Sequence, residues 1–260
     1  MLREGGVMNT LKMAEIRKKL SEKLKRYRAL KKQRGMTLLE IIIVLGIIGT
    51  IAAGVVVLAQ RAYDSKAMTD LVTNTNTIRT AIKETYGPTG IYPDEQVAGT
   101  LALTDATINN VAGADIPPIA QLVQLGKLST SEAKNNISSN YFNIGNAHVG
   151  TAGAGAGATA IGDRAYFIEV NGLDQKQCRN IMLQVGNQWD YVEVHNTAGS
   201  SGAYASGDHL NLQAAAVAGG NGAGGVVRSL ANTGNVLITP ALANGFCSDS
   251  AANSLVLGSR

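Results

Sequence analysis

The hydrophobic pattern of this chain changes abruptly near its start. Residues 1–35 are polar and strongly basic, whereas residues 41–59 carry no charge and include a single polar side chain, Thr50. A run of this length, if helical, is long enough to cross a lipid bilayer. The pattern therefore predicts a basic arm followed by a membrane-spanning helix.

The cost of exposing this segment to water argues against an ordinary surface helix. Residues 36–58 include fifteen large apolar side chains. Each contributes ~1.5–3 kcal/mol when fully buried, so leaving all of them in water would cost about 20–45 kcal/mol. We therefore expect the segment to contact lipid or other copies of itself.

Helical spacing continues beyond the apolar run. Apolar positions still recur every three or four residues, at Ala67, Leu71, Thr75, Ile78, Ile82 and Tyr86, and Gly87-Pro88 marks the end of the pattern. We predict one helix over residues 36–86, which is 51 residues or about 76 Å long. Its first part, 36–60, is apolar on all sides, and its second part, 61–86, has one buried stripe.

The remaining residues, 87–260, have the mixed pattern of a globular α+β head. Residues 87–118 predict a loop, and the Gly/Ala-rich stretches 151–160 and 214–225 predict exposed loops. Short helices are expected at 119–125, 131–135, 174–185 and 226–230, with Asp174 as the cap of the third. Strands are expected at 165–170, 189–195, 236–239 and 254–257. We expect an antiparallel sheet packed on the amphipathic half of the long helix.

Charge is distributed unevenly between the arm and the body. Residues 1–35 hold 12 of the 23 Lys and Arg and 3 of the 19 Asp and Glu, whereas residues 36–260 hold 11 and 16. The body therefore has a slight acidic excess and no basic patch, which argues against binding to nucleic acid. Because the basic arm directly precedes the apolar helix and only Arg61 closely follows it, we expect the arm to remain cytoplasmic and the body to cross the membrane.

No spacing of reactive side chains predicts an active site or a metal site. The histidines are far apart and form no HxxxH pair, and the carboxylates that we considered are interpreted as solvated surface charges (His148, His195, His209; Asp163, Asp174, Glu193). The Gly-rich stretches lack the motif of a phosphate-binding loop. We expect no enzymatic activity, no metal and no cofactor.

One acidic residue, Glu40, lies at the start of the apolar segment. A carboxylate in hydrocarbon costs ~2.5–3.5 kcal/mol at the bilayer centre and less near its edge, so such a residue is usually paired. Cleavage of the chain after Gly35 would create a new α-amino group at Met36. That ammonium, on a neighbouring copy, is a suitable partner for Glu40.

The junction resembles the class III signal of type IV pilins, with Lys-Gln-Arg-Gly at 32–35, Met-Thr-Leu-Leu-Glu at 36–40 and an apolar helix after it. A long leader with methionine at the new terminus is similar to the type IVb subgroup. The body also resembles enteric type IVb major pilins at residues 58–62, 120–127, 132–136, 171–173, 177–179 and 184–187. The resemblance implies the type IV pilin fold. It also implies cleavage after Gly35 by prepilin peptidase, N-methylation of Met36 and a docking role for Glu40.

The same resemblance implies a structural role. The chain would polymerise with itself into a surface filament for adhesion, bacterial aggregation and host colonisation, with a receptor on the host surface. Assembly would require a cytoplasmic ATPase, a platform protein and an outer-membrane secretin. The precursor would lie in the inner membrane of a Gram-negative bacterium with its head in the periplasm, and the mature protein would be extracellular.

The two cysteines, Cys178 and Cys247, are consistent with two buried thiols or with a disulfide. An oxidising compartment favours pairing, and the chain-entropy model assigns such a bridge ~4 kcal/mol. The resemblance agrees, since type IV pilins close their C-terminal region with a disulfide.

Other interpretations of the chain remain. The apolar run could be a signal peptide cut near residues 50–52, although Glu40 and the continuation of the run to Ala59 argue against it. It could also be a signal anchor that holds a periplasmic domain. A type II secretion pseudopilin and a membrane-anchored enzyme are further alternatives.

Three glycines, Gly46, Gly49 and Gly54, lie inside the apolar helix and each costs ~1 kcal/mol relative to alanine. They do not form a GxxxG motif. Our hypothesis is that this stretch unwinds when the helix passes from lipid into a filament.

Overall fold

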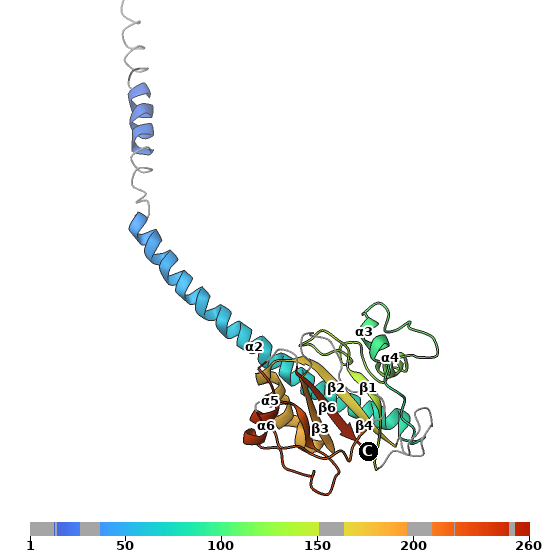
Figure 1. Cartoon of the computed structure of the whole chain (residues 1–260). Helices are drawn as coiled ribbons and strands as arrows, with labels where there is room; N and C mark the ends of the chain where they lie inside the picture. The colour runs from blue at the N-terminus through green and yellow to red at the C-terminus, as the bar shows by residue number, and fades with distance from the viewer. Residues whose placement is uncertain are drawn as a thin grey trace, which may run out of the picture. The chain divides into compact units, whose positions relative to one another are not determined.

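A computed structural model of the chain describes residues 13, 15–26, 37–150, 164–196, 210–220, 222–249 and 253–260 (Figure 1). It divides into two compact units, Met1–Arg61 and Ala62–Arg260. The predicted cleavage site, Gly35 and Met36, lies outside the described residues.

One long helix, α2 (Leu38–Tyr86), begins in the first unit and ends in the second. It is 49 residues long and includes a part that is long and apolar enough to cross a membrane. None of the residues in that part is buried. The helix ends at Tyr86, and Gly87 follows it at a position where a Cβ atom would clash with the carbonyl oxygen of Lys83. Gly90, with a φ of 65°, then donates its N–H to the carbonyl of Tyr86 at 3.0 Å. Glycine is required there because this left-handed φ disfavours other residues.

The head in the second unit is built on a six-stranded sheet with the order β4-β1-β2-β6-β3-β5. All pairings are antiparallel except that of β1 with β4. The strands are β1 (Asn143–His148), β2 (Ala165–Leu173), β3 (Tyr191–Asn196), β4 (Leu210–Asn211), β5 (Gly225–Arg228) and β6 (Asn253–Ser259). The last strand of the chain, β6, therefore lies in the interior of the sheet between β2 and β3 (Figure 1).

The two faces of the sheet have different partners. One face packs with the amphipathic half of α2 in the main core, which includes Leu71, Ile78 and Ile82. The other face forms a smaller cluster around Phe167 and Val256. The predicted fold class, a long helix packed on an antiparallel sheet with short helices, is confirmed by this arrangement.

The short helices agree only in part with the predictions. The expected helices at 119–125 and 174–185 correspond to α4 (Pro118–Gln124) and α5 (Gln175–Val185). A third helix, α3 (Val97–Ala102), lies in the region predicted to be a loop, and α6 (Pro240–Phe246) was not predicted. Thr239 caps α6 by accepting the N–H of Leu242 at 3.3 Å.

Three predicted elements are wrong. Residues 131–135 form a turn instead of a helix because the chain pairs there, through the bridge of Lys134 with Tyr141. The expected helix at 226–230 is instead strand β5, in which the β-branched Val226 pairs with Glu193 of β3. The expected strand at 236–239 is irregular, since the side-chain amide of Asn187 binds the backbone of Ile238.

Two further strands, β1 and β4, lie where the sequence predicted no regular element. Strand β1 contains two asparagines and a glycine, which have low strand propensity, and all of its residues are buried. Its burial on both faces removes the alternating pattern on which a strand prediction depends. Strand β4 has only two residues.

Candidate assembly site

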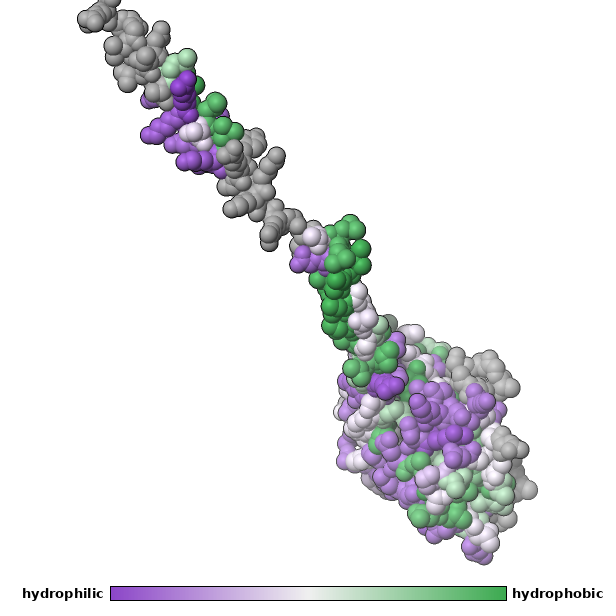
Figure 2. All heavy atoms as spheres, turned by 90° about the vertical axis from the view of Figure 1, so that its left-hand side faces the viewer, coloured by the Kyte–Doolittle hydropathy of each residue, from purple (hydrophilic) through white to green (hydrophobic). Residues whose placement is uncertain are grey.

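The apolar half of α2 presents its side chains outward. Large side chains from Leu38 to Leu58 are between 38% and 80% exposed. Thr50, the only polar residue in the run, donates its hydroxyl to the carbonyl of Ile47 at 2.8 Å, which satisfies it within the helix. Figure 2 shows this part of the chain as a continuous hydrophobic surface. Among the described residues of the unit Met1–Arg61, no side chains pack over this surface.

Glu40 is the third residue of α2 and is exposed. Its backbone N–H donates to the hydroxyl oxygen of Thr37 at 3.3 Å, and the N–H of Ile41 donates to the carbonyl of Thr37 at 3.2 Å. Thr37 thus acts as the N-cap of the helix. A carboxylate in the first turn also interacts favourably with the helix dipole, so Glu40 has a local role in addition to the predicted intermolecular one.

The glycines of the apolar half have open space around them. A Cβ atom at Gly46, Gly49 or Gly54 would meet nothing within 4 Å. The helix is continuous through these positions in the structure. The hypothesis of unwinding concerns the assembled filament and stays a prediction.

The amphipathic half of α2 buries a stripe that matches the predicted spacing closely. Its buried residues are Met68, Leu71, Asn74, Thr75, Ile78, Ala81 and Ile82. Asn74 extends the stripe with a polar side chain whose amide donates to the carbonyls of Ser131 and Lys134, both at 3.4 Å. Thr75 donates to the carbonyl of Leu71 at 2.7 Å. The two buried polar residues are therefore satisfied.

Arg79 fastens this half of the helix to the sheet and was missed by the sequence analysis. Its guanidinium lies 4.7 Å from the ring centroid of Trp189, and it donates to the carbonyl of Gln188 at 3.0 Å and to the hydroxyl of Ser259 at 3.3 Å. Ser259 in turn donates to a carboxylate oxygen of Asp190 at 3.1 Å. The sequence showed only that a basic residue lies beside an apolar stripe. Its partners could not be predicted because they lie more than one hundred residues away in the chain.

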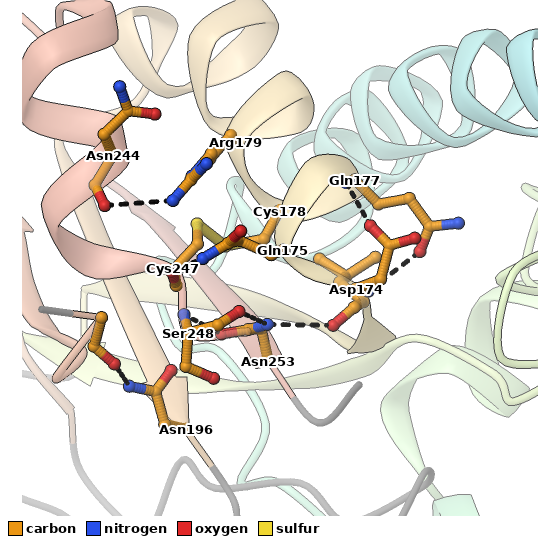
Figure 3. The surroundings of a disulfide bond; sticks show 12 residues. Asp174, Gln175, Gln177, Cys178, Arg179, Asn196, Asn244, Cys247, Ser248 and Asn253 are labelled. Atoms are coloured by element: carbon orange, nitrogen blue, oxygen red, sulfur yellow. Dashed lines mark hydrogen bonds between the residues drawn. A yellow bond between two sulfur atoms is a disulfide. The ribbon is translucent and has the colours of Figure 1, made fainter. Parts of the chain in front are cut away.

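The structure joins Cys178 on α5 to Cys247, directly after α6, in a disulfide (Figure 3). The bridge is surrounded by backbone contacts. Gln175 donates to the carbonyl of Cys247 at 3.1 Å, and Arg179 donates to the carbonyl of Asn244 at 3.3 Å. The α5 helix begins with a reciprocal cap, in which Asp174 and Gln177 each bind the backbone N–H of the other. Asp174 is therefore a capping residue and not merely a solvated charge.

The described part of the Gly/Ala-rich stretch 214–225 is only partly the exposed loop that was expected. Residues 215, 217, 218, 220 and 223 are exposed, whereas Gly222 and Gly224 are buried where the stretch packs against the same region. A Cβ atom at Gly219 would lie 2.4 Å from the ring of Phe246, and one at Gly222 would lie 2.7 Å from the Cα of Ser248. Gly222 also donates its N–H to the carbonyl of Gly245 at 2.9 Å. The glycines permit this close approach of two backbones. The other stretch, 151–160, lies outside the described residues.

Glu193 is also not a solvated surface charge. It accepts a hydrogen bond from the Tyr191 hydroxyl at 2.7 Å, and its carboxylate lies 3.2 Å from Nε2 of His195, with which it forms an ion pair when the imidazole is protonated. Burial, the largest single influence, would raise the pKa of Glu193, but the nearby imidazolium of His195 and the Tyr191 hydroxyl outweigh it and lower that pKa. For His195, burial opposes protonation, yet the carboxylates of Glu193 and Glu169 raise its pKa overall.

The other candidate residues do not converge on a reactive site. His148 is buried at the end of β1, whereas His209 and Asp163 lie outside the described residues. Among the residues that the structure describes, no group of three or more His, Cys, Asp or Glu side chains is arranged to hold a metal ion.

Comparison with known proteins agrees with these features. The chain matches the family of the toxin-coregulated pilus subunit TcpA over residues 121–244 and the prokaryotic N-terminal methylation motif over residues 30–56. A toxin coregulated pilin of Vibrio cholerae is 40% identical over 200 residues, which is 76% of each chain. Another, from Vibrio cholerae serotype O1, is 36% identical over 199 residues and again 76% of each chain.

A solved structure shows the same fold. The crystal structure of TcpA, a type IV pilin from the El Tor biotype of Vibrio cholerae, superposes with a TM-score of 0.54 and 22% identity. The match covers 75% of this chain and 99% of that chain. The long helix, the sheet and the methylation motif thus define a type IV pilin, which is a structural subunit and not an enzyme. The chain belongs to the toxin-coregulated pilin family.

Proposed function

We propose that this chain is the major subunit of a type IVb pilus and that it polymerises through the apolar half of α2. The observation that supports this most directly is the apolar surface of residues 38–58, which follows the methylation motif and has no cover within its own unit. Exchange of lipid for neighbouring helices is nearly neutral in hydrophobic energy. Specific contacts must therefore set the register of the subunits.

We infer that processing creates one of those contacts. Prepilin peptidase would cleave after Gly35 and methylate the new terminus at Met36, both of which lie within the matched motif. The carboxylate of Glu40 would then pair with the Met36 ammonium of an adjacent subunit. In a surrounding of low dielectric constant, this pair is strong enough to favour one axial register over others.

The location and the partners follow from this role. The precursor would span the inner membrane with residues 1–35 in the cytoplasm and the head in the periplasm. The assembly ATPase, the platform protein and the secretin would build and export the filament, which would then serve adhesion, aggregation and colonisation through a host-surface receptor. Within the type IVb subgroup, we propose longus pilin and the colonization factor antigen III major pilin as the nearest relatives, with toxin-coregulated pilin more distant.

A type II secretion pseudopilin is the second candidate. It shares an N-terminal methylation motif and a long apolar helix. The family match over residues 121–244, which includes Cys178, favours the pilin. Electron microscopy distinguishes the two, because only a pilus subunit yields long surface filaments at native expression.

The test is mass analysis of filaments sheared from the cell surface. We expect a chain that begins at Met36, carries one added methyl group and retains the disulfide. A mature chain that begins at any other residue would refute both the processing site and the pairing with Glu40.

Substitution at the cleavage site provides a second test. The peptidase must approach the backbone at Gly35 closely, so Gly35→Ala should be processed better than Gly35→Leu. Immunoblots of membranes would resolve precursor from mature chain. Normal processing of Gly35→Leu would contradict the predicted steric requirement.

A further inference from the structure

The leader contains a helix that the sequence analysis did not separate from the rest of the basic arm. Residues 15–26 are helical, and the Ser21 hydroxyl donates to the carbonyl of Lys18 at 2.8 Å within it. We refer to residues 15–26 as the leader helix. A helix of this length is marginal in water unless one of its faces is covered.

One face of the leader helix is apolar. Met13, just before it, and Ile16, Leu20 and Leu24 within it are spaced by three or four residues and therefore form one stripe. Their exposed fractions lie between 55% and 61%. Figure 2 shows hydrophobic atoms along one side of this segment and hydrophilic atoms along the other.

The rest of the helix surface is basic. Residues 15–26 include six Lys and Arg against two Glu. Arg17 and Lys23 lie three residues on either side of Leu20 and so flank the stripe, where long side chains can extend toward a polar boundary. Lys18 and Lys25 lie on the opposite face. An apolar stripe with a basic polar face is typical of a helix that lies in the interface of an anionic membrane.

A membrane surface is always within reach of this helix. Eleven residues, 27–37, connect the leader helix to α2, whose first half is the candidate membrane span. Even fully extended, this connection is about 40 Å long at most. The tether therefore gives the bilayer a high effective concentration at the helix, which a soluble protein partner lacks.

We propose that the leader helix of the precursor binds the cytoplasmic surface of the inner membrane, with Ile16, Leu20 and Leu24 in the acyl boundary and its basic residues on anionic headgroups. It thereby holds the bond between Gly35 and Met36 at the membrane surface until cleavage. The location rests on the proposed topology, in which the leader is cytoplasmic. The lipid contact itself rests only on the stripe, the charges and the tether.

The contact can be measured on the full-length precursor in vesicles. The described cysteines are both in the disulfide, so a single nitroxide label can be attached at Leu20→Cys or, as the matched control, at Lys18→Cys on the opposite face. In phosphatidylethanolamine–phosphatidylglycerol vesicles, we expect the label at position 20 to be relaxed by dissolved oxygen and protected from an aqueous nickel complex. The label at position 18 should behave in the opposite way.

The difference between the two positions should shrink in phosphatidylcholine vesicles at high salt, because the charge attraction is then removed. Equal exposure of both labels to water in anionic vesicles would overturn the proposal. Protection of position 20 that appears only when the assembly ATPase is added would also overturn it and would assign the stripe to a protein partner.

A matched pair of charge substitutions tests the effect on processing. Leu20→Glu and Ser21→Glu add the same charge at adjacent positions, but Ser21 lies about 100° around the helix from Leu20 and outside the stripe. We expect Leu20→Glu to slow cleavage by about fivefold or more and Ser21→Glu by less than about twofold. Equal rates would refute the positioning of the scissile bond. Cleavage at a residue other than Gly35 would refute the proposed processing site and leave the label measurement unaffected.

Discussion

The two halves of helix α2 have the same backbone conformation and opposite environments. Ile48 in the first half is 56% exposed, whereas Ile78 in the second half is completely buried. The second half completes the core of its own head, and the first half has no such cover within its unit. The contrast supports the proposal that the first half contacts lipid before assembly and other subunits afterwards.

The largest expected effect is on assembly and comes from Glu40. Glu40→Ala should still be cleaved after Gly35, but the yield of sheared filaments should fall by about tenfold or more because the Met36 ammonium then has no partner in an apolar environment. Glu40→Gln, which preserves the shape without the charge, is the control that isolates the electrostatic contribution. Filament yield equal to that of the unaltered chain in both variants would show that the two halves differ in hydrophobicity alone.

The disulfide should have the largest effect on the head. Replacing Cys178 and Cys247 together by serine removes a cross-link between residues 69 positions apart and should lower the free energy of unfolding by ~4 kcal/mol. Fluorescence of the single tryptophan, Trp189, which is 1% exposed, reports unfolding of the head in detergent-solubilised protein. An unchanged denaturation midpoint would mean that the contacts around the disulfide maintain the stability of the head without the disulfide itself.

A matched pair of isoleucine substitutions tests the comparison of the two halves directly. Ile78→Ala should lower the free energy of unfolding of the head by about 2–5 kcal/mol, because it leaves a cavity in the main core. Ile48→Ala should change it by less than about 0.5 kcal/mol, since that side chain is 56% exposed and lies outside the unit that forms the head. The same fluorescence measurement serves both. A similar loss in the two variants would contradict the division of the helix into an external and an internal half.

The smallest expected effect depends on pH and concerns the pair of Glu193 and His195. Because the pKa of His195 is raised, this residue stabilises the folded head fully at pH values below its ordinary pKa of 6.5. That stabilisation is lost as the pH rises through the raised pKa. Because the pKa of Glu193 is lowered, this residue stabilises the folded head fully at pH values above its ordinary pKa of 4.5. That stabilisation is lost as the pH falls through the lowered pKa. The pair therefore stabilises the folded head fully between pH 4.5 and pH 6.5.

His195→Gln should accordingly lower the free energy of unfolding by about 1 kcal/mol near pH 5.5 and by much less at pH 9. Thermal unfolding at both pH values, followed by Trp189 fluorescence, measures the difference. A loss that is independent of pH would show that His195 acts through packing instead of charge.

Local patterns allowed much of the fold to be predicted. The long helix, the capped helix after Asp174 and the strands around 165–170, 189–195 and 254–257 each have a strong periodic or capping signal. Predictions failed where tertiary contacts override weak local preferences. The fully buried strand β1 has no alternation, and the Gly-rich segment at 214–225 is shaped by its contact with the chain after α6. The residues of the candidate site also differ in how well they could be predicted. Glu40 was found because it is an acidic residue at the start of an apolar run, whereas nothing in the sequence distinguishes Arg79 from other basic residues.

The sequence alone determined that this protein has an apolar helix long enough to span a membrane, with an acidic residue at its start and a match to the N-terminal methylation motif around that start. Length, hydrophobicity and a local motif are sufficient for these features, since they depend on residues close together in the chain. Only the tertiary structure decided which residues the buried stripe of the helix packs against and that the last strand lies inside the sheet. It also decided that Glu193 and His195 form a pair and that Arg79 binds the end of that strand. These features depend on contacts between residues far apart in the sequence, which no local pattern encodes.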